Sequence, residues 1–397
     1  MYPLKAKLKQ ALRTLAPIAL VTILMIVFAE GLVRISAFLW SDYGAYYFSY
    51  GFVSLDGNLG ISPWSTHSGG YYKFPPNYQL KGAAGQATEV ASINSLGFRG
   101  PEFRPTKPKG TFRIVCLGES STFGYHNTDG GTYPVLLEKI LRQASGDASI
   151  EVINAGFPYY NSASILALLR EEVSHYDPDV ITLYSAFNDA AWPLKVNLFS
   201  RVVFWIQEHS AVYLLIKEIF HIDSLYLQLM SKITRRIRLE AVNYEPFKIE
   251  IDQVALRFRE NVTSIVKFAK ETGIAVVLIK QPMTAQNPQS GRLISYDEEY
   301  QSVMEKFRSG AFLSPNQLNL IKHHRLIEEL ETIAKEEGLD VVDNIALVDQ
   351  HKGGLASWVH LTEDANLRLA EALKSAITPY IKNRRAYATR RSAVARR

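Results

Sequence analysis

Two residues far apart in the chain, Ser120 and His360, have the types that nucleophilic acyl chemistry needs. A serine hydroxyl is a weak nucleophile until a nearby imidazole accepts its proton, after which a covalent acyl-enzyme can form. The stretch FRIVCLGESSTFGY (112–125) places Ser120 just after an apolar run and Gly118, and SWVHLTEDAN (357–366) places His360 just before an expected helix start. These patterns predict a serine nucleophile and a histidine general base.

The oxyanion of such a reaction needs fixed hydrogen-bond donors, and two further stretches offer them. NAGFPYYNS (154–162) contains Gly156, and SAFNDA (185–190) contains Asn188. We expect the backbone N–H groups of Ser120 and Gly156, together with the side-chain amide of Asn188, to form an oxyanion hole. The N-terminus of the helix that follows Ser120 favours the developing negative charge.

Apolar runs that alternate with helix-like segments must position these residues. Five such runs are FRIVCL, SIEVINA, DVITLYS, IAVVLIK and LDVVDN, which lie within 112–344. Buried strands separated by helices predict a parallel sheet covered on both faces, in the α/β class. Ligands bind beyond the carboxyl ends of the strands in such a sheet, and Ser120, Gly156 and Asn188 follow three of them. We therefore expect these residues to meet at one rim.

Four of these stretches, in this order, resemble the sequence blocks of the SGNH (GDSL-type) hydrolase superfamily. LGESSTFGY resembles its first block, NAGFPYYNS its glycine block, SAFNDA its Gly-x-Asn-Asp block and SWVHLTEDAN its Asp-x-x-His block. The resemblance covers residues 112–380. It implies a flavodoxin-like three-layer sandwich with a central parallel sheet of about five strands, and hydrolysis or transfer of ester-linked acyl groups. We expect no cofactor and no metal ion.

Three positions depart from the pattern of this family. Glu119 stands where aspartate is usual, and Ala186 replaces the glycine of the third block. Ser357 stands where the aspartate partner of the catalytic histidine is expected. Without that carboxylate, control of the imidazole tautomer weakens. Either the site works as a Ser-His dyad, or Asp349 or Asp343 supplies the acid from the preceding loop.

The N-terminal segment 1–40 predicts a membrane helix. Residues 14–29 (TLAPIALVTILMIVFA) carry no charge and follow a basic stretch. A bilayer core needs about 20 apolar residues in a helix, and the residues that follow can extend the run. The basic flank predicts a cytoplasmic N-terminus and a single-pass anchor, with the body outside the cytoplasm, in the periplasm or beyond the cell. A cleaved signal peptide is the alternative, and it exports the body equally.

The rest of the chain divides by composition. Residues 41–110 predict an irregular arm with short strands, in which NSLGFRGPEF (94–103) resembles an arm of membrane-anchored bacterial members of the family. The hydrolase-like domain is expected at 111–383. Its amphipathic helical insertion, 192–240, is either a lid, a membrane-surface element, an acyl-binding wall or an ordinary packed insertion. Residues 384–397 predict a disordered arginine-rich tail.

The net charge of +5 is concentrated at the two ends of the chain, where the first 13 residues and the tail are basic. The body between them is mildly acidic and shows no basic stripe interleaved with aromatic residues, so we expect no nucleic-acid partner. The single cysteine, Cys116, excludes an intramolecular disulfide and lies in an expected core strand.

Three functions fit these patterns. The first is a serine esterase that removes acetyl or longer acyl groups from a lipid or cell-envelope glycan, and the second is an O-acyltransferase that acts on a polysaccharide. The third is a catalytically weakened binding protein, marked by Ser357. His126 is a minor alternative base because it is close to Ser120 in sequence. The adjacent His323 and His324 cannot both face one metal ion from a helix.

Overall fold

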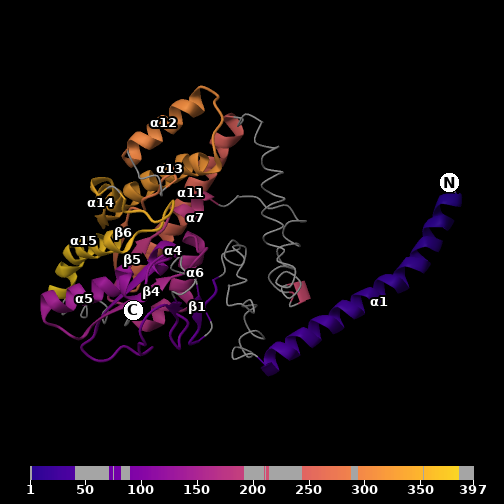
Figure 1. The fold of residues 1–397 in the computed structure, drawn as a ribbon, viewed down its shortest axis with the longest axis horizontal. Coiled ribbons are helices and arrows are strands. Elements are labelled where there is room, and N and C mark those ends of the chain that lie inside the picture. The colour runs from indigo at the N-terminus through magenta and orange to yellow at the C-terminus, as the bar shows by residue number, and fades with distance from the viewer. Residues whose placement is uncertain are drawn as a thin grey trace. The chain divides into compact units, whose positions relative to one another are not determined.

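A computed structural model of the chain describes the N-terminal helix and most of the α/β domain (Figure 1). The described residues are 2–40, 71–74, 76–81, 90–191, 210, 212–213, 244–287, 294–351 and 353–383. The expectations for 41–70, for nearly all of the 192–240 insertion and for the 384–397 tail lie outside these residues. The chain divides into two compact units, 1–62 with 197–232, and 63–196 with 233–397.

The first unit contains the long helix α1 (Tyr2–Trp40). Its segment Leu15–Ser36 is long and apolar enough to cross a membrane, and its apolar side chains are exposed. Length and composition alone fit a membrane anchor and a signal sequence equally. Glu30 lies one turn before Arg34 and forms an ion pair with it at 2.8 Å.

The second unit is built on a five-stranded parallel sheet in the order β4-β3-β5-β6-β7. Its strands are β3 (Phe112–Gly118), β4 (Ile150–Gly156), β5 (Val180–Tyr184), β6 (Ala275–Ile279) and β7 (Asp340–Val342). Each corresponds to one of the five apolar runs, because strands covered on both faces are rich in aliphatic residues throughout. The predicted α/β class and central parallel sheet are confirmed.

Helices cover both faces of this sheet and complete three layers (Figure 1). α5 (Tyr133–Ser145) and α15 (Glu363–Lys382) pack together over one face. α6 (Ser162–Glu171), α11 (Tyr244–Glu271) and α13 (Pro315–Glu337) pack as a second layer. The remaining helical elements of this unit are α4 (Ser120–Phe123), η1 (Asp129–Gly131), η2 (Val173–Tyr176), α7 (Phe187–Ala191), α12 (Tyr296–Arg308) and α14 (Asn344–Gln350).

Strand β4 is an edge of the sheet, and side chains satisfy its outward backbone groups. The Val152 N–H donates to the Glu138 carboxylate at 2.8 Å, and the Arg142 guanidinium donates to the Ile150 carbonyl at 2.7 Å. Both side chains come from α5, where they also pair with each other. Because an unpaired edge is a template for strand addition, these contacts protect the sheet.

The described part of the arm packs on the domain through aromatic residues. It contains a small antiparallel pair, β1 (Gln79–Lys81) and β2 (Val90–Ser92). Phe74 and Phe98 are buried, and the Phe74 ring stacks on Phe123 with centroids 5.3 Å apart. The arm therefore shares a core with the segment that follows Ser120.

Candidate active site

A tight turn carries Ser120 from the end of β3 into α4, and two glycines make room for it. A Cβ on Gly118 would lie 2.1 Å from the Thr122 hydroxyl oxygen, and a Cβ on Gly156 would lie 2.2 Å from the Phe123 nitrogen. The short helix α4 therefore rests directly on the ends of β3 and β4. Ser120 itself is partly exposed, as a nucleophile must be.

The glycine on β4 gives a sharp test of this packing. We expect Gly156→Ala to destabilise the fold by about 3 kcal/mol, the upper end of the cost of overpacking, because the obstructing atoms belong to the backbone of Thr122 and Phe123. Gly130→Ala is the matched control, since its Cβ would meet nothing within 4 Å. Thermal unfolding measures both variants, and equal melting temperatures would contradict the close approach of α4 and β4.

Ser120 and His360 meet at this rim. The Oγ of Ser120 lies 2.8 Å from Nε2 of His360, so the hydroxyl can donate to the ring when that nitrogen is unprotonated. His360 precedes α15, whose first turn is capped by the Thr362 side chain through the Ala365 N–H. The ring of Tyr125 stacks on the imidazole with centroids 5.5 Å apart. The structure thus brings together the two residues for which the sequence predicted nucleophile and base.

The other ring nitrogen of His360 faces a hydroxyl group. The Oγ of Ser357 lies 2.6 Å from Nδ1, and the backbone N–H of His360 also donates to this oxygen at 3.3 Å. The sequence had marked Ser357 only as a missing aspartate, whereas the structure places it in contact with the ring. A carboxylate is an acceptor only, but a hydroxyl can donate or accept, so Ser357 fixes the imidazole tautomer less strictly.

The two carboxylates considered as the acid have other partners. Asp343 caps α14 through the Ala346 N–H and binds the Lys280 ammonium at 2.6 Å. Asp349 accepts the backbone N–H of Tyr296 at 3.1 Å. The structure brings neither of them to His360, because each is held by α14 next to a different element.

Burial changes the basicity of His360. Burial, followed by like-charge repulsion from the neighbouring His126, lowers the pKa of the imidazole to about 3. The Ser357 hydroxyl carries no charge that would oppose this shift. The ring therefore stays neutral through the physiological pH range, ready to accept a proton but only weakly basic.

The expected oxyanion donors differ in their availability. The Gly156 N–H donates to the Asn154 side-chain oxygen at 3.0 Å. One hydrogen of the Asn188 amide goes to the Tyr160 carbonyl at 2.7 Å, which leaves its second hydrogen. The Ser120 N–H begins α4 and so has no acceptor within that helix. In this arrangement Ser120 and Asn188 have donors to offer, whereas the Gly156 N–H is already engaged.

A buried glutamate side chain next to the nucleophile joins two of the loops at the rim. Glu119 is fully buried and accepts from the Ser185 hydroxyl at 2.6 Å, the Ala186 N–H at 3.1 Å and the Asn188 N–H at 3.2 Å. Burial, followed by repulsion from Asp189, raises the pKa of Glu119 to about 8. Glu119 thereby ties the Ser120 turn to α7, the helix that carries Asn188.

The three other histidines considered in the sequence occupy different environments. The His126 ring packs edge-on against His360, with centroids 5.2 Å apart. His323 is buried with Nδ1 at 2.8 Å from the Tyr296 hydroxyl, and His324 stacks on Tyr300. Within the described residues, no three His, Cys, Asp or Glu side chains are grouped to hold a metal ion.

Among known proteins, the chain is similar only in structure, to a set of solved proteins. No family model matches the chain, and no curated protein does. A lipase/acylhydrolase from Enterococcus faecalis is 18% identical with a TM-score of 0.39, covering 67% of this chain and 95% of its own. An acetyl xylan esterase from Geobacillus stearothermophilus is 15% identical with a TM-score of 0.39, covering 69% and 97%. A GDSL-like lipase from Bacteroides thetaiotaomicron is 15% identical with a TM-score of 0.36, covering 70% and 92%. At these values the likeness settles no activity.

Proposed function

We propose that this protein is a serine hydrolase of the SGNH type that cleaves acyl or acetyl esters through an acyl-enzyme on Ser120. The observation that carries this proposal is the 2.8 Å contact between the Ser120 Oγ and the His360 Nε2. It lies at the carboxyl edge of a parallel sheet, where ligands bind in open α/β folds.

The reaction follows from this contact. The Ser120 Oγ attacks the ester carbonyl carbon as its proton passes to the His360 Nε2. The C–O bond to the leaving alcohol breaks, and this alcohol takes the proton from Nε2. Water then repeats the two steps on the acyl-enzyme, which releases the carboxylic acid and restores Ser120. The backbone N–H of Ser120 and the side-chain amide of Asn188 stabilise the oxyanion in both halves.

The substrate class that we propose is an ester on a lipid or a cell-envelope glycan. Its support is the apolar segment Leu15–Ser36, which as an anchor or an export signal would place the domain outside the cytoplasm. Transfer of the acyl group to a sugar hydroxyl would use the same acyl-enzyme. Mass analysis of a polysaccharide acceptor incubated with protein and acyl donor distinguishes transfer from release.

Covalent labelling tests the nucleophile directly. We expect an organophosphonate to add one phosphonyl group per folded chain, on Ser120, because the Ser120–His360 contact activates this hydroxyl. Intact-mass analysis and peptide mapping would locate the adduct. Ser309→Ala, which alters an exposed serine at the end of α12, should label like the wild type, whereas Ser120→Ala should not label. A folded wild-type protein that takes up no phosphonate would contradict the proposal.

A further inference from the structure

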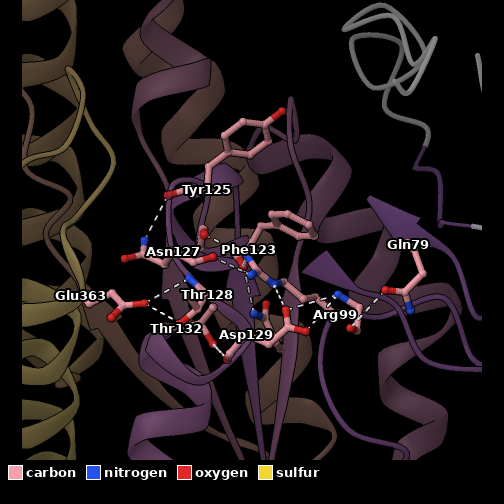
Figure 2. Close-up of polar contacts among 12 residues, drawn as sticks. Gln79, Arg99, Phe123, Tyr125, Asn127, Thr128, Asp129, Thr132 and Glu363 are labelled. Atoms are coloured by element: carbon pink, nitrogen blue, oxygen red, sulfur yellow. Dashed lines mark hydrogen bonds and ion pairs between the residues drawn. The ribbon is translucent and has the colours of Figure 1, made fainter. Parts of the chain in front are cut away.

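A buried arginine from the arm lies under the segment that follows Ser120. Arg99 is 3% exposed, and its guanidinium donates to three backbone carbonyls, those of Phe123 (3.0 Å), Gly124 (2.8 Å) and Asn127 (2.7 Å). Its Nε donates to the Asp129 carboxylate at 3.0 Å (Figure 2). We call the segment 123–129 the post-nucleophile turn. The Arg99 guanidinium thus contacts this turn at four of its residues.

The post-nucleophile turn needs such support because of its backbone. It begins at the end of α4, where the last carbonyls of a helix lack partners and a cation is favourable. Gly124 has φ 89°, and His126, which is not glycine, has φ 68°. A residue other than glycine in this left-handed region costs about 1 kcal/mol or more and persists only when its surroundings hold it. The Arg99 contacts to carbonyls on both sides of His126 supply that hold.

The post-nucleophile turn also forms hydrogen bonds with the residues that follow His360, at 361–363. The Asn127 side-chain amide donates to the Leu361 carbonyl at 3.0 Å. The Thr128 N–H donates to the Glu363 carboxylate at 3.1 Å (Figure 2). Between these contacts, the rings of Tyr125 and His126 lie against the imidazole. The turn therefore contacts both Arg99 and the His360 loop.

We propose that Arg99 is a positioning residue, which holds the post-nucleophile turn against the His360 loop and so keeps the imidazole in line with Ser120. This inference rests on the proposed function for its effect on rate. Its structural content is independent of that function, because it predicts how firmly the turn and the loop are held together.

The chain offers a matched control in Arg113, which is also fully buried. Its guanidinium donates to the carbonyls of Arg104, Pro105 and Tyr176 and to the Glu151 carboxylate. Arg113 lies near the amino end of β3, whereas Ser120 follows the carboxyl end of the same strand. A lysine at either position keeps the charge but cannot reproduce the flat fork of donors. Loss of stability alone would therefore affect both variants alike.

The experiment compares Arg99→Lys with Arg113→Lys in the full chain, held in detergent. We expect Arg99→Lys to lower kcat for a soluble ester at least about tenfold while KM changes less than about threefold, because misalignment affects the reacting atoms and not binding. Amide hydrogen exchange should rise in 120–128 and 355–363. Arg113→Lys should leave both regions and kcat unchanged, even where its melting temperature falls equally.

Each outcome decides the inference. Exchange in 120–128 that is unchanged in Arg99→Lys, or raised equally in Arg113→Lys, would overturn it. If Arg99→Lys does not fold, Asp129→Asn takes its place, since it keeps Arg99 and removes the negative charge of its partner. If the wild type hydrolyses no ester, the proposed function fails, and the exchange pattern still decides whether Arg99 holds the turn.

Discussion

Ester hydrolysis falls by at least about a thousandfold in Ser120→Ala and in His360→Ala, the largest loss that we expect from any substitution in this chain. Each variant removes one end of the 2.8 Å contact. Without the hydroxyl no acyl-enzyme forms, and without the imidazole the Ser120 proton has no acceptor. Initial rates with p-nitrophenyl acetate and longer-chain esters measure the loss and also report the preferred acyl length.

The double variant adds a second condition. Because nucleophile and base act as one unit, Ser120→Ala/His360→Ala should be no slower than the worse single variant. His351→Ala, which removes an exposed imidazole, serves as the control and should retain wild-type rates. If His360→Ala kept more than about a tenth of the wild-type kcat, another group would have to be the base, contrary to the role assigned to His360.

Ser357→Asp is expected to raise kcat/KM at pH 7 at least about tenfold, since a triad that loses the proper acceptor on Nδ1 slows by about 10⁴-fold in known cases. The aspartate would accept the Nδ1 hydrogen, fix the useful tautomer and stabilise the imidazolium. Ser357→Asn is the matched control, because it has the same shape without the charge. A rate for Ser357→Asp no higher than that for Ser357→Asn would contradict the role assigned to the Ser357 contact.

The wild type and Ser357→Asp should differ in the pH dependence of kcat/KM. The neutral imidazole is the active base, and its pKa of about 3 keeps it neutral on lowering the pH, so the wild-type kcat/KM should have no acid limb between pH 5 and 8. In Ser357→Asp, the carboxylate raises the pKa of His360 toward the ordinary histidine value of about 6.5, so activity should fall below that pH. A wild-type acid limb near pH 6.5 would show that the pKa of His360 is not lowered.

The sheet could be predicted from the sequence because its strands are buried on both faces. Runs such as Ile114–Leu117 have no polar alternation, which distinguishes them from the amphipathic helices between them. The ends of the strands were harder to predict from the sequence. LDVVDN suggested a strand over 339–344, but Asp343 caps a new helix there, so the strand is Asp340–Val342. A side-chain cap and a strand end give similar signals in a short polar stretch.

The candidate site was predicted only as far as residue types and the ends of strands allow. Ser120 and His360 follow from chemistry, but the Ser357 contact does not, since a serine in this position fits a dyad equally well. The bond from the Gly156 N–H to Asn154 depends on a side-chain rotamer that no pattern reveals. The only sequence signal for Arg99 is its place between Gly97 and Gly100, in a stretch rich in turn-forming residues.

The only thiol of the chain is enclosed by the sheet. Cys116 lies in the interior strand β3, four residues before Ser120, with no exposed surface, and burial raises its pKa to about 12. A thiol reacts as the thiolate, so we expect Cys116 not to react with alkylating reagents while the fold is intact. Thiol-directed probes should therefore leave the folded native chain unlabelled. A probe attached to one cysteine placed on the post-nucleophile turn or the His360 loop would report from that position alone.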